Sequence, residues 1–165
     1  MSDVRVGTGF DAHAFDASKQ LFLAGLSWEN QPGLAGHSDG DAVIHAIVDA
    51  LLGAAGLGDI GTHFGTSNPE YAGARSEIFL SRTVAMLAEA GWAVANVSAQ
   101  LICEQPRISN RRIEAQDYLS QIVGAPVSVT ATSTDGMGFT GRGEGVAVFA
   151  TALITRHNGS AAILA

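Results

Sequence analysis

The 165-residue chain is about one ordinary domain long, and 47% hydrophobic residues are enough for a sizeable core. Its net charge of -7 disfavours nucleic acid and anionic membranes as partners, because either needs a basic patch. The chain shows neither a membrane-length apolar run nor a signal-peptide pattern, and Cys103 is its only cysteine. We therefore expect a cytoplasmic protein that binds neither nucleic acid nor a membrane.

The first half of the chain predicts two short strands and one strong helix. The strands are expected at residues 5–8 and 21–26, on either side of a polar, irregular turn. Ser38 is a candidate N-cap of the helix, with Asp41 three positions later. The apolar positions of this helix and the glycines that end it are Val43, Ile44, Ile47, Val48, Leu51, Leu52, Gly53 and Gly56.

The second half predicts two more helices and three strands. One helix begins near Ser76 and ends before Gly91, and another covers residues 109–123 and ends at Gly124. Their buried faces are expected to carry Ile78, Phe79, Val84 and Leu87, and then Ile113, Leu119 and Ile122. The strands are expected at residues 92–103, 127–132 and 146–155.

The alternation of strands and helices predicts one α+β domain over residues 1–156, with helices packed on one face of a mixed sheet. The open face of such a sheet needs another surface against it, and oligomerisation would supply one. The tail at residues 157–165 is expected to be flexible.

A candidate metal centre combines three side chains. Asp11 and His13 are two positions apart, so in a strand both leave the same face, and His45 on the strong helix is a possible third ligand. Two imidazoles and one carboxylate suit zinc and leave one tetrahedral position open. Asp49, one turn beyond His45, could orient its ring. The alternative is that His13 is a turn residue and His45 a satisfied, half-buried histidine.

Two glycine-rich segments match the dinucleotide-binding fingerprint only superficially. No amphipathic helix follows residues 7–12, and a strand follows residues 136–141, whereas the fingerprint requires a helix. Residues 132–135 still offer hydroxyls, amides and the Asp135 carboxylate, which could cradle a phosphate and hold magnesium. A flexible hairpin with turn glycines is the alternative.

Four ordered motifs carry a family resemblance. They are Gly9-Phe10-Asp11-Ala12-His13, Gly36-His37-Ser38-Asp39-Gly40-Asp41 with His45, Gly58-Asp59-Ile60-Gly61, and Phe139-Thr140-Gly141-Arg142-Gly143-Glu144-Gly145. Together they resemble the 2-C-methyl-D-erythritol 2,4-cyclodiphosphate synthase family over residues 4–155. One departure is Gly65-Thr66-Ser67-Asn68, which stands where the family commonly has two carboxylates.

The resemblance implies a set of site residues. Zinc, or another divalent transition metal, is implied at Asp11, His13 and His45, and magnesium at Asp135. Catalytic roles are implied for His37, Ser133 and Asp135. Substrate contacts are implied at Asp11, His13, His37, Ser38, Asp59, Gly61, Phe64, Asn68, Thr132, Ser133, Thr134, Phe139 and Arg142. Cytidine contacts are implied at Cys103, Pro106, Arg107, Ile108 and Ser109.

The resemblance also implies a reaction and an assembly. The substrate would be 4-diphosphocytidyl-2-C-methyl-D-erythritol 2-phosphate, whose 2-phosphate attacks the β-phosphorus and expels CMP. The assembly would be a homotrimer whose active sites lie between subunits and whose open sheet faces pack together. An isoprenoid diphosphate could lie on the three-fold axis near Phe10, Phe139, Arg142 and Glu144, although trimer packing with an Arg–Glu pair is the alternative.

Two other functions remain open from the sequence. A metal-dependent phosphohydrolase would use the open zinc position to activate water and would release phosphate instead of CMP. A non-catalytic trimeric nucleotide-binding protein would keep the fold without turnover, but the intact set of Asp11, His13 and His45 disfavours it.

Overall fold

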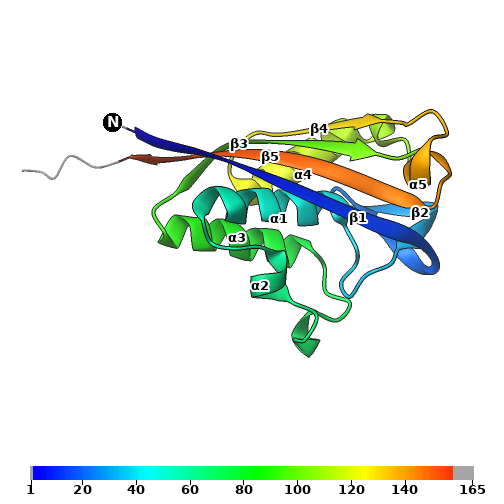
Figure 1. The fold of residues 1–165 in the computed structure, drawn as a ribbon, viewed down its shortest axis with the longest axis horizontal. Coiled ribbons are helices and arrows are strands. Elements are labelled where there is room, and N and C mark those ends of the chain that lie inside the picture. The colour runs from blue at the N-terminus through cyan, green and yellow to red at the C-terminus, as the bar shows by residue number, and fades with distance from the viewer. Residues whose placement is uncertain (1, 158–165) are drawn as a thin grey trace, which may run out of the picture.

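A five-stranded mixed sheet in the order β2-β1-β5-β3-β4 frames the computed structural model, which describes residues 2–157 (Figure 1). The strands are β1 (Ser2–Leu23), β2 (Leu26–Leu34), β3 (Ala93–Ile102), β4 (Val127–Thr132) and β5 (Gly145–His157). β3 and β4 are parallel, and the other neighbouring strands are antiparallel. The mixed sheet of the α+β prediction is therefore confirmed.

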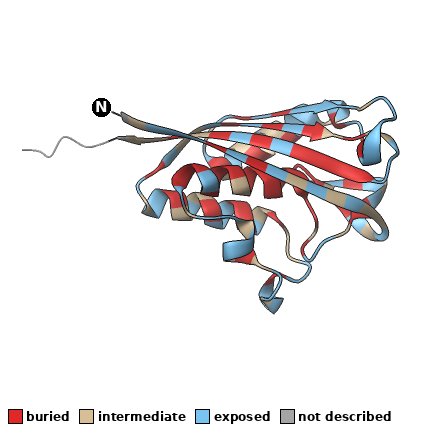
Figure 2. Cartoon of the chain, in the orientation of Figure 1, coloured by how far each residue is buried: buried red, intermediate tan, exposed pale blue. Residues whose placement is uncertain are grey.

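The helices gather on one side of this sheet. They are α1 (Ala42–Ala55), α2 (Ile60–Phe64), α3 (Glu77–Glu89), α4 (Arg112–Val123) and α5 (Gly138–Gly141), with short 3-10 turns η1 (Pro69–Tyr71) and η2 (Ile108–Asn110). α1 lies against β1 and β5, and α3 covers α1 from the other side (Figure 1). Nearly every residue of α1 is buried, so this helix is the centre of the core (Figure 2).

The N-terminal strand differs from the prediction. β1 runs without interruption through the segment 14–19 that was expected to form an irregular turn, and the chain reverses instead at Ala24–Gly25. Its first part pairs with β5, and from Phe15 onward it pairs with β2, with register shifts near Gln20 that accommodate the polar residues. Because β5 is distant in the sequence from the first part of β1, the local pattern could not reveal that pairing.

The strong helix begins three residues later than expected and ends at Gly56, one of the two expected glycines. Its N-cap is Asp41 and not Ser38, because the Asp41 carboxylate accepts hydrogen bonds from the backbone N–H groups of Val43 and Ile44. Its C-cap is Gly56, with a left-handed φ of 71°.

The other two helices were predicted better in position than in orientation. α3 follows Ser76 as expected, whereas α4 begins at Arg112 because η2 occupies the residues before it. Ile78 and Ile113, which we placed on buried faces, are 41% and 61% exposed. Each lies near the start of its helix, where few turns are available to define the apolar face.

Two glycines explain how closely α1 approaches the sheet. A Cβ atom at Gly7 would lie 2.1 Å from the carbonyl oxygen of Ala50, and one at Gly9 would lie 2.0 Å from that of Ala46. The Gly-x-Gly pattern therefore serves helix–strand packing, and the rejection of a dinucleotide fingerprint is confirmed because β1 continues as a strand. Asp11 continues the same alternation, which turns its side chain toward the helix side of the sheet.

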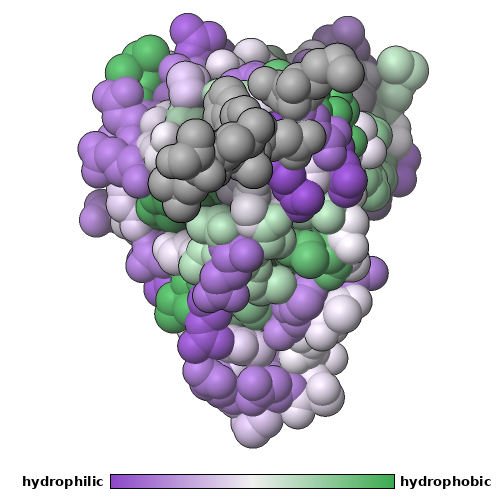
Figure 3. All heavy atoms as spheres, turned by 90° about the vertical axis from the view of Figure 1, so that its left-hand side faces the viewer, coloured by the Kyte–Doolittle hydropathy of each residue, from purple (hydrophilic) through white to green (hydrophobic). Residues whose placement is uncertain are grey.

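The opposite face of the sheet carries large exposed apolar side chains. Val4, Val6 and Phe10 of β1 are 52–63% exposed, as is Phe149 of β5 at 55%. The rings of Phe10 and Phe149 are paired with centroids 4.8 Å apart. Exposed and buried positions alternate along β1 (Figure 2). Viewed from the end where the termini lie, the molecule tapers away from the sheet toward a narrow, mainly polar end (Figure 3).

Most of the predicted flexible tail, residues 158–165, lies outside the described residues. Within residues 2–157, none of the helices combines the length and the apolarity that crossing a bilayer requires.

Candidate metal centre and active site

The predicted ligands converge on one point beside α1. Asp11 and His13 come from β1 and His45 from α1, and one ligand atom of each lies within 4.8 Å of the others. Asp11 Oδ2 is 2.8 Å from His13 Nε2 and 3.0 Å from His45 Nδ1, and these two nitrogens are 3.1 Å apart. His13 therefore lies on a strand and not in a turn, and its imidazole forms one cluster with His45 and Asp11.

The hydrogen-bonding pattern of this cluster fits a bound cation. The Nδ1 atom of His13 contacts the carbonyl oxygen of Ala35, which can only accept, so Nδ1 carries the proton and Nε2 presents a lone pair. That lone pair faces the Asp11 carboxylate, which is also an acceptor. Two imidazoles and one carboxylate are a ligand set that can hold a divalent transition metal.

The charges in the cluster reinforce one another. Burial alone would raise the pKa of Asp11, but hydrogen bonds and positive charge from His13 and His45 hold it well below its usual range. Burial lowers the pKa of His13, and the hydrogen bond and charge of Asp11 outweigh that effect and raise it. Protons and a cation therefore compete for the same atoms, so metal binding at this centre should release protons.

The cluster forms part of the wall of a pocket of about 520 Å³, within the range of small-molecule sites. The pocket is lined by Asp11, His13, His37, Ser38, His45, Ile60, Gly61, Phe64, Gly65, Thr66, Ser67 and Phe79. Asp59 and Asn68, which were also predicted as substrate residues, lie near this pocket in the sequence but are not part of its lining. The Asp59 carboxylate caps α2 by accepting from Thr62, and the Asn68 side chain caps η1 by accepting from the Glu70 N–H.

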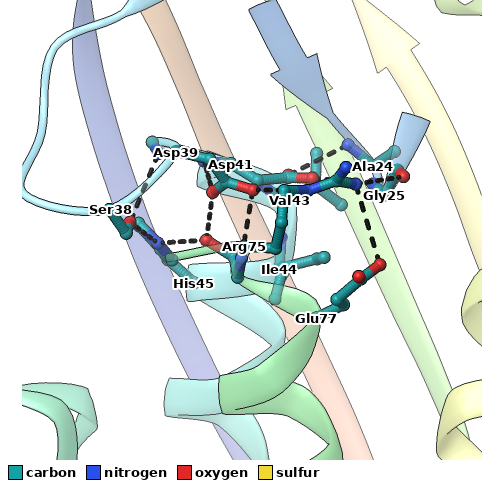
Figure 4. Close-up of polar contacts among 12 residues, drawn as sticks. Ala24, Gly25, Ser38, Asp39, Asp41, Val43, Ile44, His45, Arg75 and Glu77 are labelled. Atoms are coloured by element: carbon teal, nitrogen blue, oxygen red, sulfur yellow. Dashed lines mark hydrogen bonds and ion pairs between the residues drawn. The ribbon is translucent and has the colours of Figure 1, made fainter. Parts of the chain in front are cut away.

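A buried carboxylate anchors the segment that carries His37 and Ser38. Asp41 is fully buried and accepts hydrogen bonds at 2.7–3.2 Å from four backbone N–H groups, those of Ala24, Gly25, Val43 and Ile44 (Figure 4). Burial and the nearby charge of Asp39 raise its pKa, and the hydrogen bonds oppose that shift. Asp41 thus joins the β1–β2 turn to the start of α1, directly beside the pocket.

The prediction that Asp49 orients the imidazole of His45 is wrong. Asp49 accepts a hydrogen bond from the Ile60 N–H at 2.7 Å, which ties α1 to α2. The second ring nitrogen of His45, Nε2, lies 2.9 Å from the hydroxyl of Ser76 and 3.2 Å from that of Ser38. In the sequence Ser76 signalled only the start of a helix, so its contact with His45 was missed.

The predicted cytidine residues form a second pocket, of about 290 Å³. It is lined by Cys103, Glu104, Pro106, Arg107, Ile108, Ser109, Ala131, Thr132 and Ser133. The structure thus brings the loop after β3 together with the start of the glycine-rich loop after β4. Burial raises the pKa of the Cys103 thiol to about 11, which favours the protonated, weakly polar form in this wall of the pocket.

The remaining predicted residues line neither pocket in the single chain. The Thr134 hydroxyl donates to the Met137 carbonyl at 2.6 Å, and Asp135 is exposed with a left-handed φ of 52°. Phe139 is 42% exposed on the short helix α5. Arg142 pairs with Glu144 at 2.7 Å. One chain alone therefore does not unite the glycine-rich loop with the candidate zinc ligands.

The fold and the site define a class: an α+β domain with a mixed sheet and a candidate three-ligand metal centre at the wall of a small-molecule pocket. Within that class the chain belongs to the YgbB family, whose model matches residues 4–155.

Two named proteins match more than nine tenths of this chain in sequence. The chain is 52% identical to a 2-C-methyl-D-erythritol 2,4-cyclodiphosphate synthase of Acidothermus cellulolyticus, a match that covers 91% of this chain and 93% of that protein. It is 58% identical to a bifunctional enzyme IspD/IspF of Clavibacter michiganensis, over 94% of this chain but only 38% of that longer protein.

Solved structures agree with the observed fold. The IspF of Plasmodium falciparum in complex with CDP superposes with a TM-score of 0.81 at 32% identity, over 94% of this chain and 97% of that one. The bifunctional IspDF of Campylobacter jejuni superposes with a TM-score of 0.90 at 31% identity, over 94% of this chain and 43% of that one.

Proposed function

We propose that this protein converts 4-diphosphocytidyl-2-C-methyl-D-erythritol 2-phosphate to 2-C-methyl-D-erythritol 2,4-cyclodiphosphate and CMP. It would act as a phosphorus–oxygen lyase of the non-mevalonate isoprenoid pathway, in the cytoplasm. The observation that carries the proposal is the convergence of Asp11, His13 and His45 on one wall of a pocket, in a chain 52% identical to a protein of that name.

The reaction is an intramolecular phosphoryl transfer. An oxygen of the 2-phosphate forms a bond to the β-phosphorus, the bond from that phosphorus to the α-phosphate oxygen breaks, and CMP leaves with the electron pair. A phosphate monoester is already anionic near neutral pH, so no general base is needed. The task of the protein is to align two anionic groups that repel each other.

The side chains of the first pocket divide this task. Asp11, His13 and His45 would hold zinc, which polarises phosphate oxygens and neutralises their charge. His37 and Ser38 line the same pocket and would orient the phosphates and the methylerythritol portion. Gly61 and Phe64 lie on the wall formed by α2, where they would exclude water from the reacting groups.

The second pocket would hold the leaving nucleotide. Cys103, Pro106 and Ile108 give it an apolar wall, and Arg107 and Ser109 add polar groups for the cytidine. Thr132, Ser133 and Thr134 would contact the diphosphate, and Asp135 would bind magnesium with its hard carboxylate oxygens. The CDP named in the Plasmodium falciparum complex supports a cytidine nucleotide as the ligand class.

A homotrimer with active sites between subunits would complete the arrangement. The proposal is supported by the exposed apolar face of Val4, Val6, Phe10 and Phe149, which needs a covering surface. It is also supported by the separation of the candidate zinc pocket from the glycine-rich loop within one chain. An isoprenoid diphosphate on the axis, near Phe10 and Arg142, stays a prediction.

The decisive experiment follows the reaction by phosphorus NMR. Purified protein is incubated with the cytidylylated substrate, zinc and magnesium, and the expected products are CMP and the cyclic diphosphate in equal amounts. Release of inorganic phosphate would instead identify a phosphohydrolase. Nucleotide binding without turnover would identify a binding protein, and either result would overturn the proposal.

A further inference from the structure

The two ring nitrogens of His45 have different surroundings. Nδ1 faces Asp11 at 3.0 Å, within the candidate metal centre. Nε2 points away from that centre and lies 2.9 Å from the hydroxyl of Ser76, a fully buried residue at the start of α3. The Ser76 hydroxyl in turn donates to the carboxylate of Asp39, which lies in the loop before α1. Two hydrogen bonds thus connect His45 of the candidate metal centre to Ser76 and Ser76 to Asp39, an arrangement called the relay below.

The Asp39 carboxylate determines the direction of both hydrogen bonds in this relay. The carboxylate of Asp39 can only accept, and it also accepts from the Ser76 N–H at 3.0 Å and from Arg75 Nε at 3.2 Å. Serine has a single hydroxyl proton, which Ser76 donates to Asp39. The Ser76 oxygen must therefore accept from Nε2–H of His45. In the neutral ring, which is the form that can bind a cation, Nδ1 of His45 therefore carries no proton and presents its lone pair to the centre.

The hydroxyl of Ser76 does not cap α3. Ser76 occupies the N-cap position of α3, where a serine usually accepts from a backbone N–H of the first turn, yet it makes no such bond. The loop before α1 is already joined to α3 by the backbone N–H of Ser76 and by Arg75. The hydroxyl is therefore free to act on His45.

We propose that Asp39 and Ser76 are positioning residues that hold His45 in the Nε2–H tautomer, with Nδ1 directed at a divalent cation bound by Asp11, His13 and His45. The inference rests on the metal centre of the proposed function and assigns the groups behind one of its ligands. Such outer partners of a histidine ligand orient its ring and increase its basicity.

The test compares two serines of the same helix. Ser76→Ala removes the hydroxyl that accepts from His45, and Ser81→Ala is the matched control, because the Ser81 hydroxyl is exposed and bonds only the Glu77 carbonyl, at 2.8 Å. Zinc affinity of the metal-free proteins is measured by competition with a chromophoric chelator. We expect Ser76→Ala to bind zinc about 10- to 100-fold more weakly, and Ser81→Ala to match the wild type.

A second readout reports the tautomer directly. In nitrogen-15 histidine spectra of the metal-free wild type, recorded with the imidazole neutral, His45 should show a protonated Nε2, and in Ser76→Ala it should show a mixture of both tautomers. Either a wild-type zinc affinity or a wild-type tautomer of His45 in Ser76→Ala would overturn the proposal. If circular dichroism shows that this variant does not fold, Asp39→Asn replaces it. That substitution replaces the Asp39 carboxylate by a weaker, neutral acceptor for the Ser76 hydroxyl. Unchanged zinc affinity in Asp39→Asn would again count against the relay.

The outcome separates this inference from the proposed function. A wild-type chain that fails to bind zinc would overturn the metal centre and the relay together. A wild-type chain that binds zinc, with a Ser76→Ala variant that binds it equally well, would overturn the relay alone. Neither measurement depends on whether CMP is released.

Discussion

Two polar regions of this chain are built in opposite ways. The loop before α1, with Ser38, Asp39 and Asp41, is largely buried, and its carboxylates accept hydrogen bonds from three separate parts of the chain. The glycine-rich loop after β4 is mostly exposed, and the bonds of Thr134 and Arg142 stay within the loop. The first region is complete in one chain, whereas the second has room for partners from outside it.

The two halves of the proposed active site therefore differ in how far they are preorganised. Buried polar groups with all their partners are rigid, because an unpaired buried group costs about 1–3 kcal/mol. The candidate metal centre belongs to this rigid half. An exposed loop with only local bonds costs little to rearrange, so it can adapt to a phosphate, a magnesium ion or a neighbouring subunit.

The largest expected effect comes from removing the close approach of α1. Gly9→Ala would place a Cβ 2.0 Å from the carbonyl oxygen of Ala46, so the helix must move away from β1 and carry His45 with it. We expect loss of zinc binding and a destabilisation of at least about 3 kcal/mol. Gly53→Ala on the same helix is the control, because its Cβ would meet nothing closer than 4.0 Å. Equal thermal stability of the two variants would contradict the packing argument.

The second prediction removes one candidate metal ligand from the rigid half of the site and leaves the packing of that half in place. His45→Ala should remove zinc and reduce turnover by at least about 100-fold, while the protein stays folded. His63→Ala is the control, since its imidazole bonds the Leu57 carbonyl at 2.7 Å and it does not line the candidate metal pocket. The measurements are bound zinc by atomic emission, folding by circular dichroism and CMP release. Unchanged CMP release in His45→Ala would refute the metal assignment.

The third prediction concerns the anchor of the same half. Asp41→Ala leaves four backbone N–H groups without their acceptor, two of them at the start of α1. We expect a loss of about 3 kcal/mol in the free energy of unfolding, measured by urea denaturation. A loss below about 0.5 kcal/mol would mean that water replaces the carboxylate and that the region is not rigid.

The fourth prediction follows from the raised pKa of Asp41. A carboxyl whose pKa is higher in the folded chain contributes stability that is fully present below its unfolded value of 3.8 and is lost as pH rises through the folded value. Asp41→Asn cannot titrate, so its deficit relative to the wild type should be largest at acid pH and should shrink above the folded pKa. Thermal unfolding across this range provides the measurement, and a deficit that grows with pH would show that the sign is wrong.

The smallest effect on stability is expected in the exposed half. Asp135→Asn should change the free energy of unfolding by no more than about 0.5 kcal/mol, because the side chain is exposed and its contacts are local. It should nevertheless weaken the magnesium dependence of CMP release more than it lowers zinc content. Magnesium titrations at saturating zinc test this, and an equal loss of both metals would show that the role of Asp135 is misassigned.

The sequence predicted those elements whose cause is local. α1 and β4 were placed correctly because a strong apolar period, turn residues and glycines lie within the segments themselves. The convergence of Asp11, His13 and His45 was also predicted, from two residues that share a strand face and one histidine on the strong helix. Ile78 and Ile113 were misplaced because the buried face of a helix depends on what packs against it, and the chain alone does not reveal its neighbours.

By itself, the sequence determined the alternation of elements, the apolar core helix and the motifs that mark the family. Only the tertiary structure decided that β1 is continuous, that Gly7 and Gly9 admit α1, and that Ser76, not Asp49, stands behind His45. The physical reason is the same in each case. These features arise from contacts between segments that are far apart in the chain, and such contacts exist only once the core has brought the segments together.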